Sequence, residues 1–398
     1  MGEDRRMGFD FDAVIDRRNT WSIKWDYSIR FFGQEDILPM WVADMDFPSP
    51  PAVIEAVKKR AEHGVFGYTG MPDTCLEAVM GWMKRRNGWD MEKEWIVHSP
   101  GVVTSVITSV LTFTVPGERV LVQPPVYHPF YSSISDNGRQ LVVNPLKLQD
   151  GRYTMDFEDL EAKLLEGVKM MILCSPHNPV GRVWTKEELA QLGEICTKYD
   201  VLVVSDEIHS DLIYQGYSHT PFPMASEKMI SKSVLLISPT KTFNLAGLYT
   251  SFEVIPDSSL RKLFEMTLHK NGAAISNILG ITAAEAAFRN GEEWLNSLML
   301  YLRGNLETVV RFFKERIPAI KVIIPEGTYL VWLDCREMGM SEPELKDFFI
   351  KEARVGLNNG SIFGSEGTGF QRMNIACPRN MLIEGLKRIE SAMGKLML

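Results

Sequence analysis

Residues 170–209 read MMILCSPHNPVGRVWTKEELAQLGEICTKYDVLVVSDEIH, and this stretch decides the fold. Its two continuous apolar runs, 170–173 and 201–204, are typical of strands buried on both faces. Between the runs, Thr185 and Glu188 form a capping-box pattern, and apolar residues then recur at helical spacing. The order strand, loop, helix, strand predicts a right-handed crossover unit in a mostly parallel sheet.

Two more apolar runs of the same kind, 120–122 and 234–237, extend the predicted sheet. We therefore expect a large three-layer α/β/α domain with a mostly parallel sheet. From about residue 290 the pattern changes to a helix over 292–316 followed by short strands, which predicts a smaller α+β domain. The expected division is an N-terminal arm over 1–47 that joins the small domain, the large domain over 48–288, and the small domain over 289–398.

A polar motif follows each of the four apolar runs. The motifs are QPPVY at 123–127, SPHNP at 175–179, SDEIH at 205–209 and SPTK at 238–241. Because open parallel sheets bind ligands at the carboxyl ends of their strands, these four motifs are expected to converge on one crevice.

Composition excludes several classes of function. The net charge of −8 argues against a nucleic-acid or anionic-membrane surface, and the densest basic run, 84–86, ends a helical pattern. No apolar run approaches the roughly 18 residues of a membrane span. The start, MGEDRRMGFDFD, has no apolar segment of a signal peptide.

Five widely spaced cysteines without a Cys-x-x-Cys pair fit neither a disulfide framework nor a zinc site. We therefore expect reduced thiols, no metal and a cytoplasmic protein.

The converging loops offer what the cofactor pyridoxal 5′-phosphate (PLP) requires of a protein. Lys241 could form the imine while Ser238 binds phosphate, although a Ser-x-x-Lys pattern also fits a solvated loop. Asp206 ends an apolar strand, where a carboxylate is costly unless paired. It could face the pyridine nitrogen or serve as a helix cap. His209 could reach the ring hydroxyl or be structural.

Other candidates are also ambiguous when taken singly. Asn178 lies in a loop fixed by prolines, and Tyr127 follows two prolines, where its ring could stack on the cofactor or simply pack. Gly101 precedes the helical pattern 102–115, whose free amides suit a phosphate. Arg372 lies in the strand pattern FQRMN and suits either a carboxylate clamp or a surface salt bridge.

Taken in order, the motifs resemble the class I/II aminotransferase family of fold-type-I PLP enzymes. The resemblance covers essentially the whole chain, in Gly101 before a helix, PPVYHPFY, SPHNPVGRVW, SDEIHSDL, SPTKTFNLAGL and FQRMN. It implies a homodimer with shared active sites, an amino-acid substrate and a role for each candidate. Lys241 would be the Schiff-base lysine, Asp206 the pyridine-nitrogen partner, Tyr127 the stacking ring, Asn178 and His209 the ring-hydroxyl contacts, Arg372 with Ala43 and Asn178 the substrate contacts, and Tyr68 the tyrosine that reaches the partner subunit's phosphate.

A narrower resemblance points to one branch of this family. LPMWVADMDFPSPPAV, SDEIHSDL and GTYLVWLD are similar to the carbon–sulfur lyase branch, the MalY/PatB-like cystathionine β-lyases. Many aminotransferases carry a phosphate-binding arginine eight residues after the lysine, where this chain has Tyr249. The phosphate would then rely on Ser238, Thr240, Tyr68 and the amides of Val102 and Val103. The implied reaction is β-elimination from cystathionine or a related cysteine S-conjugate. An aminotransferase and a regulatory PLP-fold partner remain the alternatives.

Overall fold

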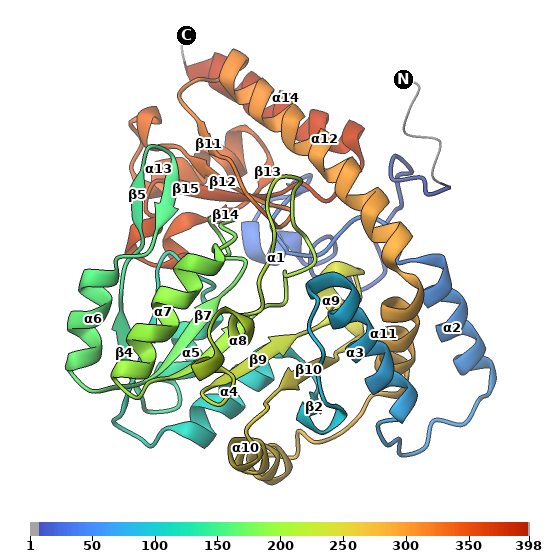
Figure 1. Ribbon diagram of the computed structural model, residues 1–398. Helices are drawn as coiled ribbons and strands as arrows, with labels where there is room; N and C mark the ends of the chain where they lie inside the picture. The colour runs from blue at the N-terminus through green and yellow to red at the C-terminus, as the bar shows by residue number, and fades with distance from the viewer. Residues whose placement is uncertain (1–7, 397–398) are drawn as a thin grey trace.

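A seven-stranded sheet crosses the computed structural model, which describes residues 8–396 (Figure 1). Its strand order is β2-β10-β9-β8-β7-β3-β4, and only β10 runs antiparallel to its neighbours. The mostly parallel sheet is therefore confirmed. The strands are β2 (Ile96–Ser99), β3 (Arg119–Val122), β4 (Gln140–Val143), β7 (Val168–Cys174), β8 (Leu202–Asp206), β9 (Ser233–Ile237) and β10 (Ser251–Val254).

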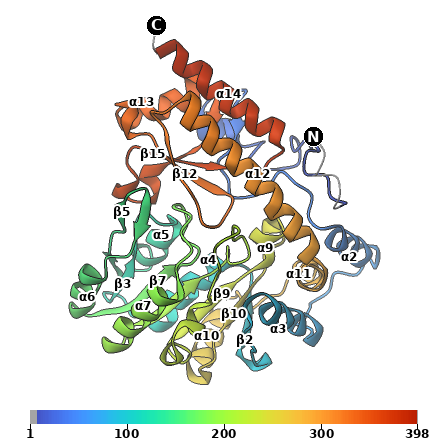
Figure 2. The same ribbon diagram turned by 45° about the horizontal axis from the view of Figure 1, so that its top comes forward.

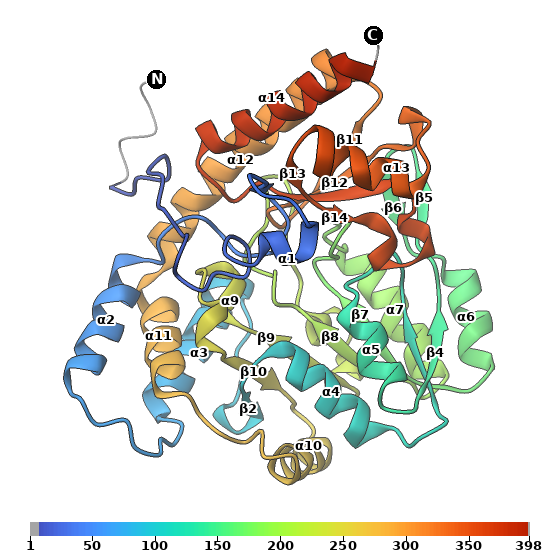
Figure 3. The same cartoon turned by 180° about the vertical axis from the view of Figure 1, so that it is seen from behind.

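Alternate residues of each central strand pack against helices on opposite faces of this sheet. Met171 belongs to the apolar cluster formed with α6 (Phe157–Leu165) and α7 (Lys186–Lys198). Met170 belongs to the cluster formed with α4 (Val102–Phe113), α5 (Pro129–Ser135) and α10 (Ser258–Lys270). Figure 1 shows α7 in front of the sheet and Figure 3 shows α4 on the opposite face, which confirms three layers.

The crossover unit forms as its sequence predicts. Thr185 Oγ1 accepts from the Glu188 amide over 3.2 Å, and Glu188 Oε2 accepts from the Thr185 amide over 2.8 Å. This capping box starts α7 one residue later. Because α7 returns the chain antiparallel to the strands, β8 can pair in parallel with β7.

A second, four-stranded antiparallel sheet has the order β11-β12-β15-β14 and lies beside two long helices, as Figure 2 shows. The predicted helix over 292–316 is α12 (Glu292–Arg316). The strand β1 near the N-terminus pairs in parallel with β13, so the N-terminal arm is joined to the C-terminal part of the chain. The domain boundaries expected at 48 and 289 remain predictions. The elements here are β1 (Leu38–Pro39), β11 (Lys321–Ile323), β12 (Leu330–Asp334), β13 (Val355–Gly356), β14 (Asn358–Asn359), β15 (Phe370–Asn374), α13 (Glu342–Asp347) and α14 (Arg379–Leu396).

The remaining elements surround these two sheets. Helix α11 contacts both α2 and α3 on one side of the large sheet (Figure 1). All five cysteines are free and buried. Between residues 8 and 396, no helix is both long and apolar enough to cross a membrane. Most of the N-terminal segment considered above as a signal peptide, residues 1–7, lies outside the described residues. The elements are α1 (Ser28–Phe32), α2 (Pro51–Glu62), α3 (Asp73–Asn87), β5 (Lys147–Gln149), β6 (Arg152–Thr154), α8 (Phe222–Ala225), α9 (Pro239–Thr242) and α11 (Ile278–Asn290).

Candidate active site

Asp206 is the last residue of β8 and is buried beside Cys174, its register partner at the end of β7. The Ile208 amide donates to Asp206 Oδ1 over 3.1 Å. Burial raises the pKa of this carboxyl to about 7, against the lowering effects of the Ile208 amide and the charge of Lys241. A cationic partner would stabilise the ionised form of this buried carboxyl and so lower its pKa.

Lys241 lies in the short helix α9, which begins two residues after β9 ends. Its amine donates a 2.6 Å hydrogen bond to the carbonyl oxygen of Ala43 in the N-terminal arm. Burial lowers the pKa of the amine to about 8, and the charges of Asp44 and Arg372 act in opposite directions on it. This lysine therefore loses its proton more readily than a solvated lysine. The solvated-loop alternative for the SPTK motif is wrong.

Two hydroxyls lie at the start of α9. Ser238 Oγ donates to the Thr250 carbonyl over 2.7 Å and accepts from the Thr240 amide over 3.1 Å. The Ser238 and Thr240 hydroxyls are themselves 2.7 Å apart. Both side chains are almost fully buried, so a polar ligand near them would meet preoriented hydroxyl groups. Their assignment to a phosphate stays a prediction.

Helix α4 begins at Val102, and Gly101 at its N-cap offers no side-chain capping bond. The first amides of a helix have no partner within the helix, and the dipole makes this end favourable for an anion. The amides of Val102 and Val103 therefore lie in the first turn of a helix, and their role in binding an anion stays a prediction. The helix ends at Phe113, two residues before the predicted end.

Arg372 lies in β15, and its guanidinium is held by oxygen atoms from three parts of the chain. Nη1 donates to Asn178 Oδ1 over 3.0 Å, and Nη2 donates to the Trp41 carbonyl over 3.0 Å and to Asn358 Oδ1 over 2.6 Å. The guanidinium also lies 4.8 Å from the centre of the Phe363 ring. Arg372 is only 5% exposed, so the surface salt-bridge alternative is wrong.

Tyr127 and His209 complete the group around the lysine. Burial, together with the charge of Asp206, raises the pKa of the Tyr127 hydroxyl. His209 is buried, its ring lies 6.0 Å from that of Tyr329, and burial with the nearby charge of Lys241 lowers its pKa to about 3. His209 is therefore a neutral imidazole. The structure brings the loops after β3, β7, β8 and β9 together with β15.

Tyr68, a candidate for the phosphate of a partner subunit, and Tyr249, which stands where many aminotransferases have arginine, are both exposed. Tyr68 is fully exposed, and Tyr249 is 65% exposed with a left-handed φ of 43°. An exposed Tyr68 agrees with the expectation that it serves another subunit.

Several residues that the sequence did not single out also contribute. The hydroxyl of buried Tyr329 donates to the Ala43 carbonyl over 3.0 Å, beside the Lys241 amine. Trp41 and Asn358, which hold Arg372, also line a neighbouring cavity of about 280 Å³. Tyr329 belongs to GTYLVWLD, but no periodicity distinguishes it from a core residue.

The buried atoms of the site fit a polar ligand. Among the described residues, His209 Nδ1, Arg372 Nε and Ser175 Oγ are buried without a hydrogen-bond partner. Buried polar atoms without partners are uncommon in proteins and usually mark a place where another group binds. With the carboxyl of Asp206 and the amine of Lys241, they match the donors and acceptors that PLP and an amino acid require.

Comparison with known proteins identifies the family. The family model described as "Aminotransferase class I and II" matches residues 35–389. The chain belongs to the class I and II aminotransferase family. The Bacillus subtilis cystathionine beta-lyase PatB is 46% identical to this chain over 96% of the chain and 100% of PatB.

Solved structures of related proteins have the same fold. Cystalysin from Treponema denticola, whose structure contains PLP, has a TM-score of 0.95 and 37% identity over 98% of this chain and 99% of its own. The PLP-bound C-S lyase from Staphylococcus hominis has a TM-score of 0.90 and 34% identity over 97% of this chain and 98% of its own. The fold expected from the sequence is therefore confirmed for this member of the class I and II aminotransferase family.

Proposed function

We propose that this protein is a PLP-dependent carbon–sulfur β-lyase that converts L-cystathionine or a related cysteine S-conjugate to a thiol, pyruvate and ammonia. The observation that carries the proposal is the meeting of Lys241, Asp206 and the Arg372–Asn178 pair at one buried site. The 46% identity to a cystathionine beta-lyase over the whole of that protein supports this choice of reaction within the family.

PLP, when bound, withdraws electrons from the substrate Cα and so makes its proton easier to remove. Asp206 would pair with the protonated pyridine nitrogen. Burial raises the pKa of the Asp206 carboxyl to about 7. A cation paired with this carboxyl would lower its pKa and keep it ionised at neutral pH. Tyr127, which feels the charge of Asp206, would lie against the ring, and His209 and Asn178 would donate or accept at its hydroxyl.

Arg372 would bind the substrate carboxylate. Asn178 and Asn358 each accept a hydrogen bond from one terminal nitrogen and so fix the orientation of the planar guanidinium, and the buried position would strengthen each hydrogen bond to an incoming anion. Ala43, whose carbonyl accepts from Lys241, would also contact the substrate. A fixed carboxylate would orient the Cα–H bond toward the lysine. Binding of the substrate would therefore also position it for removal of the Cα proton.

Lys241 would hold PLP at rest and serve as the base once the substrate has released its amine. A pKa of about 8 leaves part of the amine neutral at neutral pH, as a general base requires. Removal of the Cα proton by Nζ, followed by breakage of the Cβ–S bond, releases the thiolate. The remaining aminoacrylate takes up water to give pyruvate and ammonia.

The protein would act as a homodimer with shared active sites. Tyr68 extends from the surface, and other large apolar side chains of the N-terminal half, including Trp21 and Phe66, are also exposed. Exposed aromatic groups of this kind mark protein interfaces. Tyr68, Ser238, Thr240 and the first amides of α4 would together bind the phosphate. A cytoplasmic location stays a prediction.

The test is to incubate the purified protein with L-cystathionine and no keto acid, and to measure thiol and pyruvate. Equal amounts of both support the β-lyase. Aminotransferases of the same family use the same lysine and ring, but they need a keto acid to accept the amino group. Product that forms only after a keto acid is added would therefore favour an aminotransferase. A regulatory PLP-fold protein would show no turnover on any thioether and would retain a stable protein partner in a pull-down.

A further inference from the structure

Residues 41–47, here named the bridging segment, connect the surroundings of Lys241 with those of Arg372. The Trp41 carbonyl accepts from Arg372 Nη2 over 3.0 Å, and the Ala43 carbonyl accepts from Lys241 Nζ over 2.6 Å. Only one residue lies between these two carbonyls. A displacement of the bridging segment would therefore change the contacts of the lysine and the arginine together.

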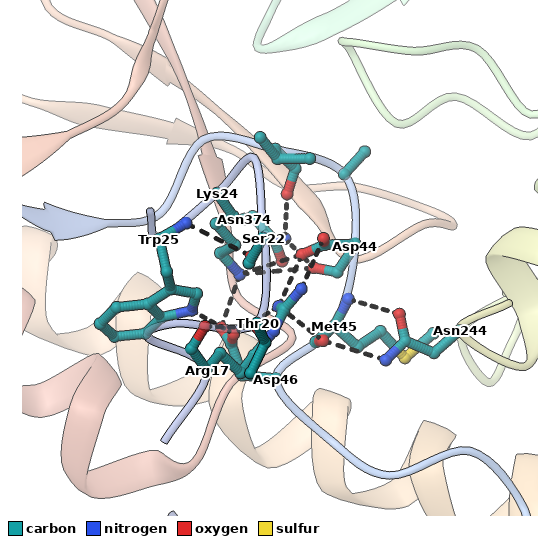
Figure 4. A network of polar contacts seen from close by, with 12 residues as sticks. Arg17, Thr20, Ser22, Lys24, Trp25, Asp44, Met45, Asp46, Asn244 and Asn374 are labelled. Atoms are coloured by element: carbon teal, nitrogen blue, oxygen red, sulfur yellow. Dashed lines mark hydrogen bonds and ion pairs between the residues drawn. The ribbon is translucent and has the colours of Figure 1, made fainter. Parts of the chain in front are cut away.

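Two asparagines fix the backbone of the bridging segment. Asn244, three residues after Lys241, donates to the carbonyls of Met45 and Phe47 and accepts from the Met45 amide. Asn374, two residues after Arg372, donates to the carbonyls of Val42 and Asp44, each over 2.6 Å. Figure 4 shows both asparagines and the charged side chains beside them.

Four charged side chains form a cluster on the bridging segment. Arg17 forms two hydrogen bonds of 2.9 Å to the carboxylate of Asp44 and one of 2.7 Å to Asp46. Lys24 Nζ lies 2.5 Å from Asp46 Oδ2 and 3.7 Å from Asp44 Oδ1. Lys24 and Asp46 are 1% and 2% exposed, so each charge depends on the other for its stability. Although burial acts to raise it, Lys24 holds the pKa of Asp46 below its ordinary value, with help from Trp25 and Arg17.

Asp44 gives this cluster a second connection to the site, through its charge. Asp44 acts to raise the pKa of Lys241. The other groups near the Lys241 amine are Asp206 at the end of β8, His209 three residues later, Arg372 on β15, and Tyr329 just before β12. Arg17 and Lys24 neutralise Asp44 and Asp46, so they determine how much of the Asp44 charge the lysine experiences.

We propose that Arg17 and Lys24 are positioning residues for the base of the reaction. They neutralise Asp44 and Asp46, and thereby hold the Ala43 carbonyl where it orients the amine of Lys241. A neutral amine that donates one N–H to this carbonyl keeps its lone pair free to accept the Cα proton. This inference rests on the proposed function only for the identity of that proton, because the geometry concerns the lysine in any PLP reaction.

The test compares Arg17→Gln with Asp44→Asn by following the visible absorbance of bound PLP against pH. Arg17→Gln exposes the Lys241 nitrogen to more of the Asp44 charge, which favours the protonated form of this nitrogen. The absorbance transition, which reports the protonation of this nitrogen in its imine with PLP, therefore moves to higher pH by about half a unit. Asp44→Asn removes the charge and moves the transition to lower pH. The double variant returns close to wild type. The same half-unit rise in the pKa of the free Lys241 amine would leave roughly threefold less neutral amine at pH 7. We therefore expect kcat/KM of Arg17→Gln at pH 7 to fall roughly threefold.

The matched control is Arg30→Gln, which removes an exposed arginine of the same arm that makes no ion pair among residues 8–396. This variant keeps the wild-type transition. Shifts of the two test variants in the same direction, or transitions that coincide with wild type in proteins of unchanged Tm, overturn the proposal and leave the cluster a purely structural one.

Two features keep this test decisive. If Arg17→Gln is too unstable to purify, Asp44→Asn carries the test alone, because the proposal requires its downward shift. The absorbance titration also needs no turnover. A protein that cleaves no thioether would contradict the proposed function, while the titration would still decide the role of Arg17 and Asp44.

Discussion

Arg372 Nη1 donates a 3.0 Å hydrogen bond to the Asn178 side chain, although 194 positions separate the two residues. Arg372 lies in β15 of the four-stranded sheet, and Asn178 follows β7 of the seven-stranded sheet. The contact forms only where the two sheets meet. A buried ion pair nearby joins the same two parts of the chain, because Arg182 Nε lies 2.9 Å from Glu326 Oε2. The proposed carboxylate site would therefore depend on the packing of the two sheets as much as on Arg372 itself.

Replacing Arg372 by lysine tests this site. Arg372→Lys keeps the charge but loses the planar fork that Asn178 and Asn358 hold, so we expect kcat/KM for cystathionine to fall roughly 100-fold, mainly through KM. The PLP absorbance and the Tm stay close to wild type. Steady-state kinetics check this expectation, and an unchanged KM would show that the substrate carboxylate binds elsewhere.

Replacing Lys241 tests the base. Lys241→Ala removes the amine that contacts Ala43, and we expect turnover to fall at least about 1000-fold together with a change in the visible absorbance of bound PLP. Lys241→Arg is the matched control for size and charge, and it is expected to be equally inactive because arginine stays protonated. Added methylamine should restore part of the turnover of Lys241→Ala. Retained turnover without added amine would reject the assignment.

The parts of the fold that depend on local pattern could be predicted from the sequence. The apolar runs gave the central strands, the capping box gave α7, and helical spacing gave α12 at its observed bounds. The polar motifs after the strands gave most of the site, because a parallel sheet brings the ends of its strands together. The residue types alone suggested a role for each motif, but each motif also has an ordinary structural explanation. The family resemblance was needed to choose between the two.

The N-terminal arm could not be predicted, and the reason is physical. Its residues 8–47 contain only the short helix α1 and the two-residue strand β1, so there is little periodicity to read. The arm is held instead by ion pairs and by side chains from distant residues, such as Asn244 and Asn374. The contact between Lys241 and the Ala43 carbonyl spans 198 positions, and no sequence pattern indicates it.

Glu253 allows a prediction about stability and pH. This residue of β10 is fully buried, and its Oε1 accepts from the hydroxyls of Ser99, Ser105 and Ser251, while Oε2 has no partner among the described residues. Burial raises the pKa of the carboxyl to about 7 from its ordinary 4.5. A raised pKa means that the folded protein binds the proton more tightly than the unfolded chain, so stability is lost as the pH rises from 4.5 through 7.

Glu253→Gln removes this titration. We expect the free energy of unfolding of wild type to fall relative to the variant by on the order of 2 kcal/mol between pH 5 and 8, as measured by urea denaturation. Glu265→Gln, on the exposed face of α10, serves as the control and should follow the wild-type pH dependence. Parallel curves for wild type and Glu253→Gln would mean that Glu253 has the same pKa in the folded and the unfolded state, and would contradict the raised pKa.

Shared active sites predict complementation between two inactive variants. If Tyr68 serves the phosphate of the partner subunit, then a Tyr68→Ala chain damages the neighbouring site, whereas a Lys241→Ala chain damages its own. In a mixed dimer both defects fall in the same site and the other site is intact. Random mixing of equal amounts makes half of the dimers mixed, so about a quarter of all sites regain full activity.

The measurement is β-lyase activity after the two chains are unfolded and refolded together, with each variant refolded alone as the control. Tyr68→Phe chains, which keep the ring, separate the hydroxyl contact from packing at the interface. Activity of the mixture no higher than the mean of the two variants alone would show that each chain builds its phosphate site from its own residues.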